Sequence, residues 1–325
     1  MHKIARLPEE KRTELFHETA AQKGMTPAIA EKDFWVTFVL ERIFSDEKLS
    51  SILIFKGGTS LSKVYGVIER FSEDIDLILD WNLLTSKDPK EERSRRQQEI
   101  LNKEINKKAK EYIATTLVET LQKQVGNICN VSVDENDRYV INVRYPSAFD
   151  ETYLRPEIRL EIGPLAEWMP NEKHKVTSYA AEVFPKLFEQ SSCEVLTILV
   201  ERTFWEKATI LHHEANRPEG SLQPQRYSRH YYDLAMMACS PIKSMALERL
   251  DLLEHVVAFK KRFYPRGWAD YDAAKPGTLK LLPSKEIEKT LRQDYRDMRS
   301  MIYGNYPEFD AILETLKKLE DEINK

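Results

Sequence analysis

The sequence predicts an α+β protein, with a mixed β-sheet flanked by helices and a C-terminal helical domain. Strand-like alternation of apolar residues is found before Glu167, whereas the patterns beyond it are mainly helical. The 325 residues, 42% of them hydrophobic, are enough for one large or two ordinary domains with a substantial core. We therefore predict a sheet-containing core with an N-terminal helical segment over residues 1–170, followed by a helical domain over residues 171–325.

The first predicted element is a helix that begins after Thr26. Thr26 is a typical N-cap residue, and Pro27 suits the first helical position because proline lacks the N–H that a helix leaves unpaired there. Apolar residues recur from Phe34 to Ile43 as they do in a mostly buried helix. We expect this helix to precede the sheet.

A strand, a tight turn and a helix are predicted next. Residues 51–55 (SILIF) are a short apolar run rich in β-branched side chains, which favours a strand. The run is followed by Gly57-Gly58, a typical turn signal, and residues 59–65 have a helical pattern.

A second strand is predicted over residues 74–79 (DIDLIL). Successive side chains of a strand point to opposite faces, so the apolar residues of this segment share one face and Asp74 and Asp76 share the other.

The rest of the chain supplies one long helix, further strands and the helical domain. Residues 86–119 are polar and helix-prone, with nine Lys/Arg against five Asp/Glu between Ser86 and Lys110, and are predicted to form a long exposed helix. The segments predicted to extend the sheet are 130–133, 139–145 and 157–162. The helices predicted beyond Glu167 are 201–214, 229–239, 246–263 and 285–325.

Composition argues against several classes of protein. Charged residues interrupt every apolar run near the N-terminus, so no signal peptide is expected, and no run approaches the ~20 apolar residues of a membrane span. Cys129, Cys193 and Cys239 lack CxxC spacing, which argues against disulfides and against a thiolate zinc site. The net charge of -4 argues against a wholly basic nucleic-acid binder but leaves a local basic surface open. We expect a cytoplasmic protein that binds no membrane.

Asp74 and Asp76 are the candidate metal ligands. Aspartates at positions i and i+2 of a strand project from the same face, and magnesium prefers carboxylate and phosphate oxygens to nitrogen or sulfur. Taken alone, a DxD pattern is more often a pair of solvent-facing aspartates than a metal site. The neighbouring glycine turn changes that balance.

The segment Gly57-Gly58-Thr59-Ser60 is the candidate phosphate-binding element. A glycine turn that leads into a helix presents unpaired backbone N–H groups and the positive end of the helix dipole to an anion, and two hydroxyls are added here. A strand-GG[TS]-helix unit followed about fifteen residues later by a strand with DxD is the signature of nucleotidyltransferases. Such enzymes use two divalent cations ~3.5 to 4 Å apart, which converging carboxylates hold.

The run FKGGTSLSKVYGVIERFSEDIDLIL, with EKDFWVTFVLERIF before it, resembles the AbiEii/AbiGii toxin family. Members of that family are nucleotidyltransferase-like toxins of bacterial abortive-infection and toxin–antitoxin systems. The resemblance implies a DNA polymerase β-like nucleotidyltransferase core, a Mg²⁺ site that holds two metal ions, and an NTP as substrate. It extends over nearly the whole chain, because the family's later E-K and R-x-x-x-D-L patterns read here as Glu206-Lys207 and as residues 229–234.

Lys207 and Asp233 are the candidate site residues of the helical domain. Lys207 shares a helix face with Phe204 and Leu211, so that it interrupts an apolar stripe. Such a lysine either extends outward to water or reaches into a cleft to meet an anion. The resemblance implies that Lys207 holds triphosphate oxygens. Asp233 either pairs with Arg229 on the surface or, as the resemblance implies, orients Lys207 or the attacking hydroxyl.

A third carboxylate usually completes the metal site in the superfamily that this chain resembles. Glu161 is our candidate, and Glu157, on the same face of its strand, is the rival. Either Asp233 or Glu161 is expected to help deprotonate the nucleophile. Arg70 contacts the nucleotide or pairs on the surface with Glu69 or Glu73.

The resemblance also implies what the chain acts on. The expected activity is transfer of nucleotides to an RNA acceptor, at the 3′ end of tRNA, which inhibits translation and serves phage defence. The expected partner is a cognate antitoxin, which need not form a stable complex. The basic segment 87–110 either contacts the phosphate backbone of RNA or is a solvated helix face. A second group either contacts RNA or consists of core side chains: Arg266, Trp268, Tyr271 and Tyr303.

Two other functions remain open from the sequence. One is nucleotidyl transfer to a hydroxyl of a protein or small molecule, as other members of the superfamily perform. The other is a catalytically silent nucleic-acid-binding or protein-binding module. The complete set of site residues argues against the silent module, because a degraded scaffold is expected to have lost some of them.

Overall fold

The structure, a computed structural model, describes residues 1–72, 74–149, 155–221 and 223–325. They form two compact units. The sheet unit comprises residues 1–64 and 71–198, and the helical unit comprises residues 65–70 and 199–325. No helix among the described residues is long and apolar enough to cross a membrane. The three cysteines are all free thiols.

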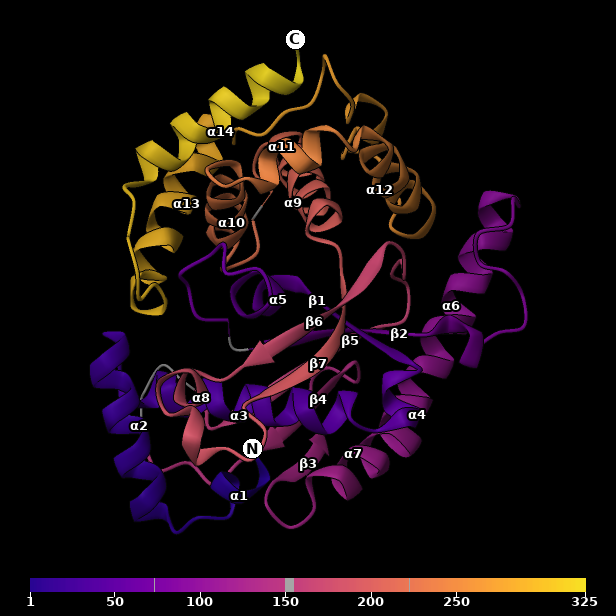
Figure 1. Cartoon of the computed structure of the whole chain (residues 1–325). Helices are drawn as coiled ribbons and strands as arrows, with labels where there is room; N and C mark the ends of the chain where they lie inside the picture. Colours follow the sequence, from indigo (N-terminus) through magenta and orange to yellow (C-terminus); the bar gives the residue numbers. More distant parts are fainter. Residues whose placement is uncertain (73, 150–154, 222) are drawn as a thin grey trace. The chain divides into compact units, whose positions relative to one another are not determined.

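A seven-stranded sheet forms the centre of the sheet unit (Figure 1). Its strands are β1 (Leu53–Lys56), β2 (Asp74–Leu79), β3 (Asn130–Val133), β4 (Val140–Arg144), β5 (Glu157–Gly163), β6 (Asn171–Thr177) and β7 (Ser192–Ile198). They lie in the order β3-β4-β5-β2-β1-β7-β6. The sheet is mixed because β2 runs antiparallel to β1 but parallel to β5. The predicted α+β class with a mixed sheet is therefore confirmed.

Helices surround this sheet. They are α1 (His2–Ala5), α2 (Glu9–Lys23), α3 (Pro27–Phe44), α4 (Glu47–Ser50), α5 (Gly57–Lys63), η1 (Trp81–Leu83), α6 (Arg95–Tyr112), η2 (Ile113–Leu117), α7 (Val118–Val125), α8 (Tyr179–Val183) and η3 (Pro185–Leu187). The buried helix α3 packs against β5 and β7. As predicted, Thr26 is its N-cap, with Thr26 Oγ1 accepting a hydrogen bond from the backbone N–H of Ile29.

The long polar helix begins later than predicted and is not exposed all round. Ser94 and Gln97 form a capping box, so α6 begins at Arg95 rather than at Ser86. A π-helical segment, η2, joins it to α7, which ends at Val125. One face of α6 is buried through Leu101 and neighbouring residues one helical turn apart.

The predicted boundary of the helical domain at residue 171 is wrong. Residues 171–198 contain the last two strands of the sheet, β6 and β7, and the helical unit resumes only at residue 199. β6 (NEKHKVT) is an edge strand, and its polar residues give no alternating apolar signal. β7 (SCEVLTI) is short and apolar, a pattern that does not by itself distinguish a strand from a buried helix.

The helical unit is built around α10. Its helices are α9 (Val200–Ala215), α10 (Ser228–Ala238), α11 (Ile242–Leu247), α12 (Leu250–Phe263), η4 (Tyr271–Ala273), α13 (Lys285–Asp297), η5 (Arg299–Met301) and α14 (Phe309–Ile323). α10 packs against α9, α11, α13 and α14. The segment 65–70 joins this unit, since Arg70 forms a β-bridge with Ile302 and the N–H of Tyr303 donates to the carbonyl of Glu69 over 3.0 Å.

Candidate active site

The candidate phosphate-binding residues form the first turn of α5. Gly57 directly follows β1 and adopts a left-handed φ of 82°, which glycine tolerates without strain. The hydroxyl of Thr59 donates to the carbonyl of Asp74, and the hydroxyl of Ser60 donates to the carbonyl of Gly57 over 2.8 Å. Both side chains are buried. The Thr59 hydroxyl therefore fixes the turn to β2, and the Ser60 hydroxyl stabilises the turn internally. In this arrangement the backbone N–H groups, including that of Gly58, are what the turn offers an anion.

The carboxylate of Asp76 lies directly against Gly57. A Cβ atom added to Gly57 would stand 1.8 Å from Asp76 Oδ2 and 2.5 Å from Asp76 Cγ. Any other residue at position 57 would therefore displace this carboxylate or the turn. The glycine turn and the DxD strand thus form a single packed unit.

Glu161 is the carboxylate next to Asp76 in the sheet. The parallel register of β2 and β5 pairs Asp76 with Glu161 and Asp74 with Arg159, so these side chains share one face. Glu157 instead lies opposite Arg144 of β4, and their side chains approach to 3.9 Å. The register therefore favours Glu161 over Glu157 as the third carboxylate.

These carboxylates match the chemistry of a magnesium site. All three offer hard oxygen ligands from adjacent strands, and neighbouring like charges favour a cation between them. No three metal-ligating side chains of the described residues stand close enough together to hold an ion as placed. Asp74 Oδ1 lies 3.7 Å from Arg159 Nε, so this carboxylate is turned along the strand pair towards Arg159. The residues fit a divalent ion in type and strand position.

In the helical unit, Asp233 is fully buried between two cations. Arg70 donates from Nε to Oδ1 over 2.6 Å and from Nη2 to Oδ2 over 2.8 Å, and Lys207 Nζ donates to Oδ2 over 2.8 Å. Burial by itself raises the pKa of Asp233, but the charges and hydrogen bonds of Arg70 and Lys207 outweigh it and hold the pKa below its usual range. Asp233 is therefore an ionised carboxylate.

This arrangement decides alternatives that the sequence left open. Asp233 pairs with Arg70 and Lys207, not with Arg229 one turn earlier. Arg70 is itself buried, so a surface pair with Glu69 is excluded, and Glu73 lies outside the described residues. Sequence reasoning missed this role of Arg70, because the two paired residues lie 163 positions apart.

Lys207 is buried rather than extended into water. Only 7% of the residue is exposed, and its Nζ also lies 3.1 Å from His230 Nδ1. Burial lowers the pKa of Lys207, and the charge of Asp233 opposes that effect. The Lys207 ammonium therefore has two partners on α10, His230 and Asp233. A buried lysine with a shifted pKa beside a paired carboxylate is typical of a functional site.

Trp268 of the helical unit has two guanidinium groups close to its ring. Arg217 Cζ lies 4.9 Å and Arg266 Cζ lies 5.7 Å from the centroid of its ring. Tyr271 is buried, so its ring belongs to the core and is not presented for base stacking. Tyr303 joins the segment 65–70 through its backbone N–H.

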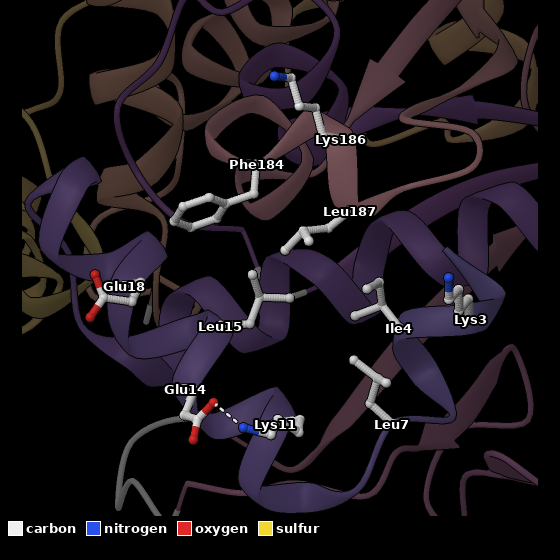
Figure 2. Close-up of a pocket in the computed structure, with 10 residues that line it drawn as sticks. All are labelled: Lys3, Ile4, Leu7, Lys11, Glu14, Leu15, Glu18, Phe184, Lys186 and Leu187. Carbon is white, nitrogen blue, oxygen red and sulfur yellow. Dashed lines mark hydrogen bonds and ion pairs between the residues drawn. The ribbon is translucent and has the colours of Figure 1, made fainter.

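The sheet unit also contains an apolar pocket away from the predicted site residues. Its volume is about 480 Å³, and it lies between α1, α2 and the segment around η3 (Figure 2). The walls are formed mainly by Ile4, Leu7, Leu15, Phe184 and Leu187, with lysines and glutamates at the rim. None of the residues that line it belongs to the predicted metal or phosphate site.

Comparisons with known proteins identify relatives over most of the chain. The family model described as "Nucleotidyl transferase AbiEii toxin, Type IV TA system" matches residues 39–315. The crystal structure of JHP933 from Helicobacter pylori is similar with a TM-score of 0.45 and 14% identity, covering 92% of this chain and 93% of that chain. The nucleotidyltransferase toxin MenT4 from Mycobacterium tuberculosis H37Rv is similar with a TM-score of 0.44 and 15% identity, covering 98% and 100%. No curated protein sequence matches the chain.

We predict that Gly57→Ala weakens divalent-cation binding by about tenfold or more, because the new methyl group displaces the Asp76 carboxylate. Titration calorimetry with Mg²⁺ or Mn²⁺ measures this. Gly24→Ala is the matched control, since Gly24 has a similar φ of 67° and nothing within 4 Å of an added Cβ. Both variants carry the cost of a left-handed alanine, about 1 kcal/mol. Equal cation affinities in the two variants would contradict the assignment of Asp76.

We also predict that Asp233→Ala destabilises the protein by about 3–5 kcal/mol, because it leaves two buried cations facing each other. Urea unfolding provides the measurement. Lys207→Met is the control, because it removes one cation and leaves Asp233 paired with Arg70. A Lys207→Met variant as unstable as Asp233→Ala would show that the cost comes from lost packing instead of from the loss of the carboxylate charge.

Proposed function

This chain belongs to the AbiEii family of nucleotidyl transferase toxins of type IV toxin–antitoxin systems, and from that premise we propose that it transfers nucleotides from an NTP to RNA with Mg²⁺ as its metal. The observation that carries the proposal is the family match over residues 39–315, which includes both the DxD strand and the Lys207 cluster. The chain is thus a nucleotidyltransferase by family. Its metal, acceptor and site residues are our proposals.

Asp74, Asp76 and Glu161 are assigned to the metal site. Bound Mg²⁺ supplies activation of the attacking hydroxyl and stabilisation of the triphosphate, and a second ion is expected in this superfamily. The pairing of Asp76 with Glu161 across β2 and β5, and the contact of Asp76 with Gly57, support this assignment. Glu161 is also assigned to accept the proton of the nucleophile.

The triphosphate is assigned to the first turn of α5 and to Lys207. Backbone N–H groups of Gly57, Gly58, Thr59 and Ser60 are suited to phosphate oxygens. Lys207 is suited to neutralise charge as pyrophosphate leaves, and the burial of its ammonium against Asp233 supports that role. Asp233 is assigned to orienting Lys207, since a carboxylate with a lowered pKa and two cationic partners is a poor base.

We propose that the acceptor is RNA, at the 3′ end of tRNA, and that the transfer inhibits translation. The proposed partner is a cognate antitoxin. Arg95 and Arg96 at the exposed start of α6 are suited to phosphate contact, which is strongly salt-dependent. Other basic residues of α6 are already paired, as Lys103 is with Glu99. A protein or small-molecule hydroxyl is the alternative acceptor, and the assay below separates these cases.

We predict that Asp76→Ala lowers nucleotide transfer by about a hundredfold or more without unfolding the chain, because it removes a metal ligand from a partly exposed position. The assay incubates the protein with total RNA, Mg²⁺ and each α-³²P-labelled NTP, followed by a denaturing gel. A labelled tRNA-sized band that the variant lacks is expected. Label in protein or in a small molecule would show that this molecule, and not RNA, is the acceptor. No label anywhere would favour a silent binding module.

The third carboxylate is tested in the same assay. We predict that Glu161→Gln lowers transfer by about tenfold or more, whereas Glu157→Gln changes it little. Both changes remove one negative charge from the same face of β5, so the pair is matched for strand, face and charge. The opposite order of activities would move the metal site to Glu157.

We predict that Lys207→Ala raises the KM for the NTP or lowers kcat by about tenfold or more, the effect of one charge-assisted hydrogen bond. Steady-state kinetics with varied NTP measure it. Lys243→Ala serves as the control, because Lys243 forms only a surface pair with Glu322. Unchanged kinetics in Lys207→Ala would remove Lys207 from the site.

A further inference from the structure

His230 contacts Lys207, the side chain of the helical unit to which the proposed function assigns the triphosphate. The Nζ atom of Lys207 lies 3.1 Å from His230 Nδ1 and 2.8 Å from Asp233 Oδ2. A lysine ammonium can only donate, so His230 accepts this hydrogen bond with an unprotonated Nδ1 and carries its proton on Nε2. The contact therefore specifies one neutral tautomer of His230.

Two acceptors three residues apart restrain the Lys207 ammonium. His230 and Asp233 lie at i and i+3 of α10, so they face the same side of that helix. An ammonium has three donors, and these two residues occupy two of them. A single partner leaves a lysine ammonium free to swing about that bond, whereas two partners fix Nζ in space. The third N–H is then available to a phosphate oxygen.

The charges around His230 favour its neutral form. The groups that act on it are Lys207 of α9, Arg70 of the segment 65–70, and Arg229 and Asp233 of α10 itself. Asp294 of the adjoining α13 accepts from the N–H of Ser228 at the start of α10. Three of the four groups that act on His230 are cations, and burial and their charges keep its pKa well below the usual value. The ring is also packed edge-on against Tyr227, with the centroids 5.0 Å apart.

We propose that His230 is a positioning residue for nucleotide binding: its neutral imidazole accepts from Lys207 and, together with Asp233, fixes the Lys207 ammonium for a triphosphate oxygen. The inference rests on the proposed role of Lys207. Protonation of His230 removes the acceptor and places a second cation beside Lys207. The protein therefore binds the NTP with the Lys207 ammonium fixed only while His230 is neutral.

Kinetics of two substitutions test the proposal. His230→Asn keeps a neutral acceptor near the position of Nδ1 and cannot gain a proton, whereas His230→Leu has no acceptor. We expect the KM for the NTP to rise about tenfold in His230→Leu and to stay within about twofold of the wild type in His230→Asn. In a Lys207→Ala background the His230→Leu change should add nothing. Unchanged KM in His230→Leu, or equal impairment of both variants, would overturn the proposal.

The pH dependence supplies a readout that a packing role would not change. Because the pKa of His230 is lowered in the folded protein, its neutral form persists at neutral pH and is lost only as the pH falls below the usual range of histidine. We expect the KM of the wild type to rise on acidification, and the KM of His230→Asn to lack that rise. An identical acid limb in both proteins would contradict the role of His230.

Histidine ¹⁵N NMR of the full-length protein tests the contact without any transfer reaction. The expected spectrum is the Nε2–H tautomer of His230 with a lowered pKa, which rises towards its usual value in Lys207→Ala. A His230 signal that Lys207→Ala leaves unchanged would sink the inference. If the wild type transfers no nucleotide but gives the expected NMR result, the proposed function fails while the contact of His230 with Lys207 stands.

Discussion

The buried carboxylate of Asp233 is the constraint on which the helical unit depends. Its partners come from different parts of the chain, with Arg70 from the segment between α5 and β2 and Lys207 from α9. The chain enters the helical unit at residue 65 and leaves it again after residue 70. The ion pair of Arg70 with Asp233 holds this short segment in the unit. The β-bridge between Arg70 and Ile302 fixes the same segment through its backbone. One side chain thus ties together α9, α10 and the connection into the DxD strand.

Such a cluster adds little net free energy of folding. Desolvation of buried charges offsets most of their attraction, and apolar residues of similar size often stabilise a core as well or better. The proposed role in NTP binding explains why a buried ammonium is kept here, because lysine forms strong charge-assisted hydrogen bonds with phosphate oxygens. The Lys207 ammonium, restrained by Asp233 and His230, then loses little freedom when it meets the ligand.

The parts of the site that the sequence predicts are those formed by neighbouring residues. The glycine turn, the strand with Asp74 and Asp76, and the helix that carries Lys207 follow from local patterns. The pairing of Asp76 with Glu161 depends on the register of β2 against β5. Strand alternation predicts which face each side chain is on, but it does not fix that register. The partner of Arg70, the role of His230 and the strand β6 were not predictable, because they depend on contacts distant in sequence or on a polar edge strand.

The two units carry charged residues that suit different parts of the proposed ligand. In the sheet unit, the register places Asp76 beside Glu161, and adjacent carboxylates suit a divalent cation. In the helical unit, Asp233 and His230 hold the Lys207 ammonium, which suits a phosphate oxygen. Neither set identifies the ligand by itself, because two aspartates on a strand are often solvent-facing residues and a buried lysine is often structural. The proposal of an NTP with Mg²⁺ therefore rests on the family match, which spans both sets of residues.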